Sequence, residues 1–313
     1  MNFFDEFEAY LREQDRAERT VSGYLADLPI FSTWFEQATG EAFQPDFVTP
    51  TDVREFRQHS LLHKKNSGNT INRRLAALTA YFAFLVKQGK LEQNPALGIR
   101  KVDVPRSSPR WLDRKEQYRL SRVMEQDLQL AIARYPKRWV NRQRDFSLVT
   151  LLKHTGLRVH EVTHLEIGDL AISDRKGSLL VRAGKGSKQR KIPLNADARN
   201  TLRAWLDIRP DLPENYFVFI ALGSDARGPL SSRTVQRIVA HYGKKAGLPD
   251  LAPHILRHTF AKNLVDSGVG LEKVAALLGH SSLDTTRIYI MPGIRDLEQA
   301  VAKVESRVSS SPL

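Results

Sequence analysis

A proline-rich stretch, NPALGIRKVDVPRSSPR at residues 94–110, separates two regions of helical pattern and limits the folds open to this chain. It contains three prolines and no apolar repeat, so neither a helix nor a strand is expected within it. The chain has 313 residues, which is more than one small core needs. The sequence therefore predicts a domain at 1–93, an extended linker at 94–112 and a second domain at 113–313.

The first region, residues 2–90, has the apolar spacing of four helices. In the fourth, the apolar residues are spaced 4, 3, 4 and 3 positions apart: Ile71, Leu75, Leu78, Phe82 and Leu85. The third begins at TPTD, where Thr49 has the place of an N-cap and Asp52 that of a capping-box acid. Pro29 falls inside the second helix, so a kink or a break is expected there.

In the second region, helical patterns resume at Trp111 and are interrupted once, at GSLLVRAGKGSKQRKIPL, residues 177–194. The flanks of this segment have β character and its middle is a glycine-rich basic turn, which predicts a β-hairpin. A further short strand is expected at YFVFI, residues 216–220. The predicted class is therefore mainly α, with a small antiparallel sheet in the second domain.

Lysine and arginine number 48 against 35 acidic residues, and the net charge of +13 is spread along the chain. This balance favours a polyanionic partner, most commonly nucleic acid, over a merely solvated basic surface. No run of 18 apolar residues and no signal-peptide pattern is present, so we expect a cytoplasmic protein with no membrane partner. The absence of cysteine excludes disulfides and thiolate metal sites.

Tyr289 stands in HSSLDTTRIYIMPG, residues 280–293, where a short helix is expected. A tyrosine hydroxyl has a pKa of about 10 and is almost wholly protonated near neutral pH. As a nucleophile it would need a base or positive charge beside it. The alternative is an ordinary core tyrosine.

The segment PHILRHTF, residues 253–260, places His254 and Arg257 on one face of a helix. His258 follows His254 by four positions, which raises the possibility of a metal site. The metalloprotease pattern requires glutamate directly after the first histidine, and this chain has Ile255 there. We therefore predict no metal site, and an amphipathic helix with a polar face remains the alternative.

In TGLRVHEVTHL, residues 155–165, Gly156 ends one helix and Arg158 begins the next, with Glu161 placed to hold its guanidinium. An arginine held by a carboxylate keeps its donors oriented for a phosphate. A surface ion pair is the alternative.

In AGKGSKQR, residues 183–190, glycines flank Lys185 and leave the backbone free to approach a phosphate, but the spacing is not that of a P-loop. Nucleotide hydrolysis is therefore not predicted, and a solvated hairpin tip is the alternative. His280 follows Gly279, where it would otherwise be a capping histidine.

Taken together, these residues occur once each in one order: Arg158, Lys185, His254-x-x-Arg257, Gly279-His280 and Tyr289. The set resembles the active-site signature of the tyrosine recombinase (phage integrase) family. The strings TGLRVHE, GKGSKQRKIPL, HILRHTFA and LLGHSSLDTTRIY are similar to family motifs, and the N-terminal half resembles the core-binding domain of Xer-type proteins. The resemblance covers nearly the whole chain. Two departures are His160, where serine is usual, and a longer segment at 126–145.

The resemblance implies that Tyr289 attacks a DNA phosphate, leaving a 3′-phosphotyrosine and a free 5′-hydroxyl, with no cofactor, ATP or metal. It implies that Arg158 and Arg257 bind the non-bridging oxygens of that phosphate, with Glu161 in support. His280 would add a hydrogen bond to the phosphate. Lys185 would protonate the leaving oxygen, and His254 would accept the proton of Tyr289 or help to position it.

It also implies a SAM-like N-terminal domain that closes with the catalytic domain as a C-shaped clamp on double-stranded DNA. The expected DNA contacts are Thr70, Arg73, Arg74, Lys188 and Arg190. Recombination would occur in a homo-tetramer on two sites, or in a tetramer shared with a paralogous recombinase. A narrow apolar stripe at 294–304 is expected to dock on a neighbouring protomer, and packing on its own domain is the alternative. The alternatives are a transposon or phage integrase with the same chemistry, a type IB topoisomerase, and a non-catalytic DNA-binding relative.

Overall fold

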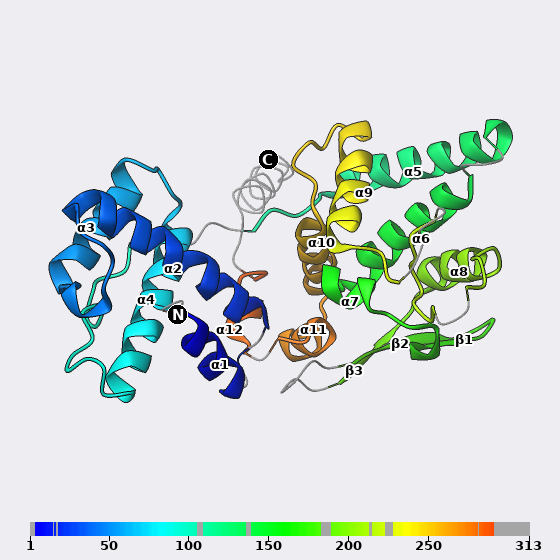
Figure 1. Cartoon of the computed structure of the whole chain (residues 1–313). Coiled ribbons are helices and arrows are strands. Elements are labelled where there is room, and N and C mark those ends of the chain that lie inside the picture. Colours follow the sequence, from blue (N-terminus) through cyan, green and yellow to red (C-terminus); the bar gives the residue numbers. More distant parts are fainter. Residues whose placement is uncertain are drawn as a thin grey trace, which may run out of the picture. The chain divides into compact units, whose positions relative to one another are not determined.

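The computed structural model describes residues 4–14, 16, 18–104, 109–135, 139–182, 189–212, 215–222, 228–280 and 282–290. The chain divides into two compact units, Met1–Arg106 and Ser107–Leu313 (Figure 1). Each unit has its own hydrophobic core. Both are mainly helical, and the second contains a small antiparallel sheet, which confirms the predicted class. The division between the units falls inside the segment predicted as a linker.

The first unit is built from helices α1 (Asp5–Glu13), α2 (Glu18–Thr39), α3 (Pro50–Leu62) and α4 (Gly68–Lys87), with a 3-10 turn at Pro45–Phe47. The capping box at the start of α3 is present, because the Thr49 amide donates to Asp52 at 2.8 Å and the Asp52 amide donates to Thr49 at 3.4 Å. The predicted apolar stripe of α4 is buried in the core of this unit.

Pro29 does not break α2, contrary to one of the two expected outcomes, since the helix is continuous from Glu18 to Thr39. A proline inside a helix costs about 3 kcal/mol, through a lost hydrogen bond and a steric clash. Leu28, Phe31 and Phe35 of the same helix are buried. Each buried side chain of this size stabilises the fold by about 1.5–3 kcal/mol, which outweighs the cost of the proline.

The first part of the proline-rich stretch packs against the first unit. The side chain of Asn94 donates to the carbonyl of Thr79 at 3.0 Å. Asn72 and Val102 exchange two hydrogen bonds, of 2.9 and 2.8 Å, between the amide side chain and the backbone. These contacts hold residues 94–102 against α4, so this part of the stretch has defined partners although it is neither helix nor strand.

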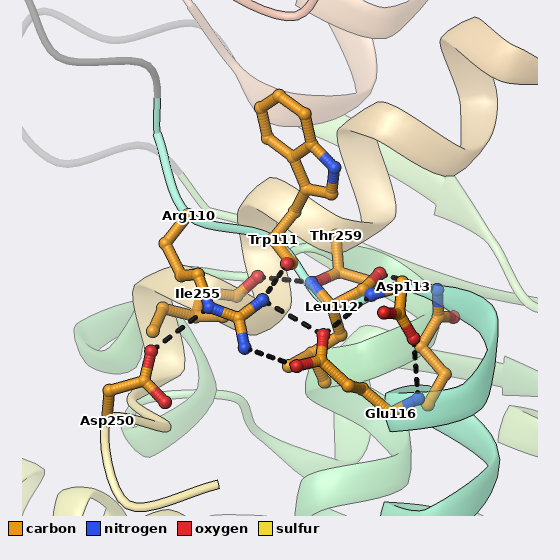
Figure 2. Close-up of polar contacts among 9 residues, drawn as sticks. Arg110, Trp111, Leu112, Asp113, Glu116, Asp250, Ile255 and Thr259 are labelled. Atoms are coloured by element: carbon orange, nitrogen blue, oxygen red, sulfur yellow. Dashed lines mark hydrogen bonds and ion pairs between the residues drawn. The ribbon is translucent and has the colours of Figure 1, made fainter. Parts of the chain in front are cut away.

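The last part of the stretch is fastened to the second unit, as Figure 2 shows. Arg110 donates to both oxygens of Glu116, at 3.0 and 2.7 Å, and to Asp250 at 3.1 Å. The amide of Leu112 donates to the hydroxyl of Thr259 at 2.9 Å. Thr259 lies in α10 (Pro253–Asp266), the helix that carries the predicted histidines His254 and His258 and Arg257, so this segment supports that helix directly.

The second unit contains helices α5 (Arg114–Arg134), α6 (Trp139–Thr155), α7 (Val159–Thr163), α8 (Ala196–Leu206), α9 (Ser232–Lys245), α10 (Pro253–Asp266), α11 (Leu271–Leu278) and α12 (Asp284–Arg287). Helix α6 is central, because it packs against α5, α8, α9 and α10. Its residues Leu148, Val149, Leu151 and Leu152 are all buried. Helix α6 ends at Thr155, and the buried Leu157 lies between it and Arg158, so Arg158 directly follows a segment of the core.

The sheet consists of β1 (Leu170–Ile172), β2 (Gly177–Val181) and β3 (Arg190–Pro193), in that order and antiparallel throughout. The predicted hairpin is confirmed as β2 and β3, whereas β1 was not predicted. Residues 183–188, which include Lys185 and Lys188, lie outside the described residues. The strand expected at 216–220 is wrong: although Val218, Phe219 and Ile220 are buried, in the described residues this segment makes only isolated bridges, Phe217 with Glu166 and Ile220 with Pro229, and neither bridge extends into a ladder.

The described parts of segment 126–145 belong to the end of α5 and the start of α6. Its basic side chains contact acids within the unit. Arg142 lies 3.1 Å from Asp127, and Arg144 lies 2.7 Å from Asp145. The Arg142 pair joins α6 to α5, whereas Arg144 pairs within α6 and also donates to the carbonyl of Ile220 at 3.1 Å, so both side chains contribute to packing. Among all described residues, no helix is long and apolar enough to span a membrane.

Candidate active site

Three arginine side chains meet at the C-terminal end of α11. The helix ends at Gly279, whose φ of 66° is left-handed, and the amides of Gly279 and His280 bond back to carbonyls of the helix. The following carbonyls then accept from arginines: Leu277 from Nε of Arg190 at 2.9 Å, Leu278 from Nη2 of Arg257 at 2.7 Å, and Gly279 from Nη2 of Arg158 at 3.2 Å. A helix C-terminus carries partial negative charge, which stabilises cations there.

Arg257, in α10, is the most enclosed of the three, with 8% of its surface exposed. Besides Leu278, it donates to the carbonyl of Gly156 at 2.6 Å. Burial, then the charge of Arg158, lowers the pKa of Arg257 to about 10, so it stays charged at neutral pH. Gly156 has a φ of 62°, and a Cβ there would lie 2.6 Å from the Phe260 ring, which explains the glycine. Carbonyls thus orient this guanidinium without neutralising it.

Arg158 and Arg190 share one buried carboxylate, Glu161. Arg158 precedes α7 and donates to Glu161 from its backbone amide at 2.7 Å and from Nη1 at 3.0 Å. Arg190, the first residue of β3, donates to the two oxygens of Glu161 at 2.9 and 2.8 Å. Burial alone would raise the pKa of Glu161, but hydrogen bonds from Arg190 and Arg158 lower it to about 2. Two guanidinium groups therefore contact one ionised carboxylate, and with Arg257 at the same end of α11 the site is positively charged.

Tyr289 lies just beyond α12, in the turn that follows it, and not inside the helix as expected. Its side chain is 1% exposed and packs with Ala261, Val274 and Leu278. Burial raises the pKa of Tyr289, although the charges of Arg257 and Arg158 oppose this effect. The hydroxyl is consequently protonated at neutral pH, and it requires a proton acceptor before it can act as a nucleophile.

His258 is the side chain that contacts the Tyr289 hydroxyl: its Nδ1 lies 2.8 Å from that oxygen. Burial, then the charges of His254 and Arg257, lowers the pKa of His258 to about 4. His258 is therefore neutral at pH 7, and a neutral imidazole has one nitrogen that can accept a hydrogen.

His254, which the sequence predicted as the proton acceptor, is exposed in the first turn of α10. Its ring centre is 6.1 Å from that of His258. In the described part of the chain, no group of three or more histidines, cysteines or acids is arranged to hold a metal ion. Among the described residues, His254 and His258 therefore have no third side chain that would complete a metal site with them.

His280 follows Gly279 at the end of α11 and contacts the segment that leads to Tyr289. Its Nδ1 lies 2.9 Å from the hydroxyl of Thr286, a fully buried residue of α12. Burial, followed by the charges of Arg257 and Arg158, lowers the pKa of His280 to about 4. A neutral His280 can thus contact Thr286 through Nδ1 and use its other ring nitrogen, Nε2, for a different hydrogen bond.

Of the expected DNA contacts, Thr70, Arg73 and Arg74 lie in the first unit, on α4. Thr70 shares a 2.9 Å hydrogen bond with the N-cap Ser67. Arg73 donates to Asp27 at 2.5 Å, and Arg74 lies 3.6 Å from the same carboxylate, which is buried. The side chain of Arg73 is 48% exposed and that of Arg74 only 13%. Arg73 therefore has the accessibility that a phosphate contact requires, and Arg74 mainly neutralises Asp27.

Two features of the site were not predicted from the sequence. The first is the contact of His258 with Tyr289, and the second is the position of Arg190, which was expected to contact DNA and instead holds Glu161. Signals for the first were present, since His258 directly follows Arg257 and lies one helical turn after His254. The second depends on how β3 approaches α7, which local patterns do not report.

The fold and motifs match known proteins. A model described as the phage integrase family matches residues 122–293, and one for a phage integrase N-terminal SAM-like domain matches residues 4–89. The chain is 33% identical to tyrosine recombinase XerC of Xanthomonas axonopodis pv. citri, over 92% of each chain. It is 33% identical to tyrosine recombinase XerA of Pyrococcus furiosus, over 96% of this chain and 92% of the relative.

Among solved structures, the fold is similar to that of XerH site-specific recombinase bound to a palindromic difH substrate in a post-cleavage complex. The TM-score is 0.74 and the identity is 23%, over 95% of this chain and 85% of that one. It is also similar to the Tn1549 transposon integrase in complex with transposon right end DNA, with a TM-score of 0.69 and 19% identity, over 97% and 100% of the two chains. At these identities the likeness concerns the fold.

Proposed function

This chain belongs to the phage integrase family of tyrosine recombinases, and on that premise we propose that it is a site-specific recombinase that cuts and rejoins duplex DNA through a 3′-phosphotyrosyl intermediate. One observation carries the proposal: the hydroxyl of Tyr289 lies 2.8 Å from His258, in the same unit as the three arginines held at the end of α11. A protonated nucleophile, a neutral acceptor and fixed positive charge are what phosphoryl transfer to tyrosine requires.

In the cleavage step, the Tyr289 oxygen bonds to a backbone phosphorus while its hydrogen passes to His258. The bond from phosphorus to the 5′-oxygen breaks, and that oxygen gains a proton, for which we propose Lys185 as the donor. Attack by the 5′-hydroxyl of another strand reverses these steps and releases Tyr289. The energy of the phosphodiester bond is kept in the intermediate, so no nucleotide is consumed.

Negative charge grows on the non-bridging oxygens in the transition state, and we assign its stabilisation to Arg158 and Arg257. Both are fixed before substrate arrives, Arg158 by Glu161 and Gly279 and Arg257 by two carbonyls. Donors that are already oriented need no reorganisation during the reaction, which is why they are effective. We propose that the second ring nitrogen of His280 adds a neutral hydrogen bond to the same phosphate.

We propose double-stranded DNA as the substrate, with four protomers acting on two sites, either identical or shared with a paralogous recombinase. The net charge of +13 supports a polyanionic partner, and the related XerH structure contains its difH substrate. Thr70, Arg73 and Lys188 are proposed DNA contacts. The helix expected at 294–304 lies outside the described residues and is proposed to dock on a neighbouring protomer. A cytoplasmic location remains part of the proposal.

The function is tested by covalent trapping. A DNA site is first selected from random duplex by binding, and it is then prepared with a nick from which the cleaved fragment is lost. The protein should form a denaturant-resistant adduct with this substrate in EDTA and without ATP, because fixed cations supply the charge that metals supply elsewhere. If EDTA abolishes the adduct and a single metal restores it, the arginine-based mechanism is wrong.

The two histidines are separated by their response to pH. His258→Asn keeps a polar group near the hydroxyl but removes the base, so cleavage at pH 7 should fall by about 10²-fold or more. Because hydroxide can then replace the lost base, the rate of this variant should rise steeply between pH 7 and 9. His254→Asn is the matched control, and its rate should follow the wild-type profile. The reverse pattern would return the acceptor role to His254.

A further inference from the structure

The position of Arg190 carries an inference beyond the proposed function, on which it rests. Its guanidinium faces into the second unit, with 13% of the side chain exposed, compared with 37% for Arg158. Within the described part of the chain, the hydrogen bonds of this group are internal: two to Glu161 and one to the carbonyl of Leu277. We propose that Arg190 is a positioning residue, which fixes Glu161 so that Glu161 holds Arg158 against the scissile phosphate, and that it is not a DNA contact.

The geometry of the carboxylate supports this role. Arg190 contacts Glu161 through both Nη atoms, which fixes the plane and the rotation of the carboxylate, as a bidentate pair does. Glu161 then presents one oxygen to Nη1 of Arg158 and the other to its backbone amide. Without Arg190, Glu161 keeps only its bonds to Arg158, so the carboxylate is held less firmly and the orientation of Arg158 becomes less precise.

Gly279 indicates that space is reserved for this guanidinium. A Cβ at Gly279 would lie 2.7 Å from Nη1 of Arg190, closer than such atoms approach, and 3.0 Å from its Cζ, so the guanidinium would have to move. The same residue gives its carbonyl to Arg158. The glycine of the Gly279-His280 motif thus serves two purposes: it ends α11 in the left-handed conformation, and it admits Arg190 beside Arg158.

The balance of charge around Glu161 is a second reason why Arg190 matters for Arg158. The side chain of Glu161 is 6% exposed, and it is faced by Arg158 just before α7, by Arg190 from β3 and, at longer range, by Arg257 from α10. With Arg190 present, one carboxylate is divided between two guanidiniums, so Arg158 is oriented but not neutralised. If Arg190 is removed, Arg158 alone must compensate the carboxylate, and less of its charge remains for a phosphate.

The test uses the full chain and the selected nicked duplex, and it compares Arg190→Ala, Arg158→Ala and the double variant. Arg182→Ala is the matched control, because Arg182 follows the partner strand β2 and also pairs with two acids, Glu166 and Asp169, away from Arg158. Three quantities are measured for each: the affinity for intact DNA, its dependence on salt, and the single-turnover rate of adduct formation. Thermal melting shows that each variant is folded.

Arg190→Ala should slow adduct formation by about 10²-fold, in the range for loss of one oriented donor, while affinity and salt dependence stay at the wild-type values. The double variant should be no slower than Arg158→Ala, because residues that act through one another are not additive. Arg190→Lys should recover only part of the rate, since an ammonium cannot hold both oxygens in one plane. Arg182→Ala should cleave at the wild-type rate.

Three results would overturn the inference. A weaker affinity with a smaller salt dependence would make Arg190 a phosphate contact. Multiplied losses in the double variant would show that it does not act through Arg158. Recovery of Arg190→Ala on a 5′-bridging phosphorothiolate, which needs no acid for its leaving sulfur, would place its effect on the hairpin that carries Lys185. If the wild-type protein forms no adduct, the proposed function fails first, and that result is distinct from these three.

Discussion

Replacement of Tyr289 by phenylalanine should abolish the covalent DNA adduct while leaving the fold and DNA binding intact. The change removes one oxygen from a side chain that is 1% exposed and keeps the ring in its apolar cluster. The lost hydrogen bond to His258 should cost about 1 kcal/mol of stability, which a domain of this size tolerates. Adduct is measured on denaturing gels with the nicked duplex, and affinity is measured on the intact one.

Tyr242→Phe is the matched control for this experiment. Tyr242 is also fully buried in the second unit, and its hydroxyl donates to Asp127 at 3.3 Å. This variant loses a comparable bond but should form the adduct at the wild-type rate. An adduct with Tyr289→Phe, or its loss with Tyr242→Phe, would contradict the assignment of Tyr289 as the nucleophile.

Arg257→Lys should have the second-largest effect, a loss of roughly 10²–10³-fold in the rate of adduct formation. A lysine keeps the positive charge, but its single ammonium cannot span the carbonyls of Gly156 and Leu278 as the guanidinium does. The donor that faces the phosphate is then misplaced although the charge remains. The variant should also melt at a lower temperature, because a carbonyl that stays buried without a partner is destabilising.

Arg209→Lys separates the two consequences. The guanidinium of Arg209 is likewise held by backbone carbonyls, those of Asn215, Phe217 and Pro210, and it contacts none of the described active-site residues. A loss of stability similar to that of Arg257→Lys is expected, with cleavage by the folded protein unchanged. If Arg209→Lys slows cleavage as much, the effect at Arg257 is one of general stability and not of phosphate binding.

The helical class and the hairpin could be predicted because their signals are local. The stripe of α4 repeats at helical spacing, and the capping box at Thr49 and Asp52 lies within four residues. The family resemblance was equally accessible, because five motifs occur in order, and the matches at 4–89 and 122–293 confirm it. Of the two outcomes expected at Pro29, a kink or a break, the break did not occur, because the burial of its apolar neighbours outweighs the local cost of the proline.

The sequence motifs predicted which residues belong to the candidate active site, but not which of them contact one another. That Arg158 and Arg257 converge follows from the motifs, yet their common support at the end of α11 depends on tertiary packing. His254 and His258 differ by one helical turn, and only the placement of Tyr289 decides which of them it meets. Arg190 is a basic residue in a glycine-rich basic segment, so the sequence suggests a DNA contact. Its side chain points inward to Glu161 because β3 approaches α7, which the sequence does not reveal.

The central claim is tested most directly by identifying the bond in the trapped adduct. The wild-type protein is reacted with the nicked duplex and digested with a protease, and the peptide that stays attached to DNA is sequenced by mass spectrometry. We predict that this peptide contains Tyr289, linked through its oxygen to a 3′-phosphate, with a free 5′-hydroxyl on the released strand. Attachment at any other residue, or through a 5′-phosphate, would contradict the account.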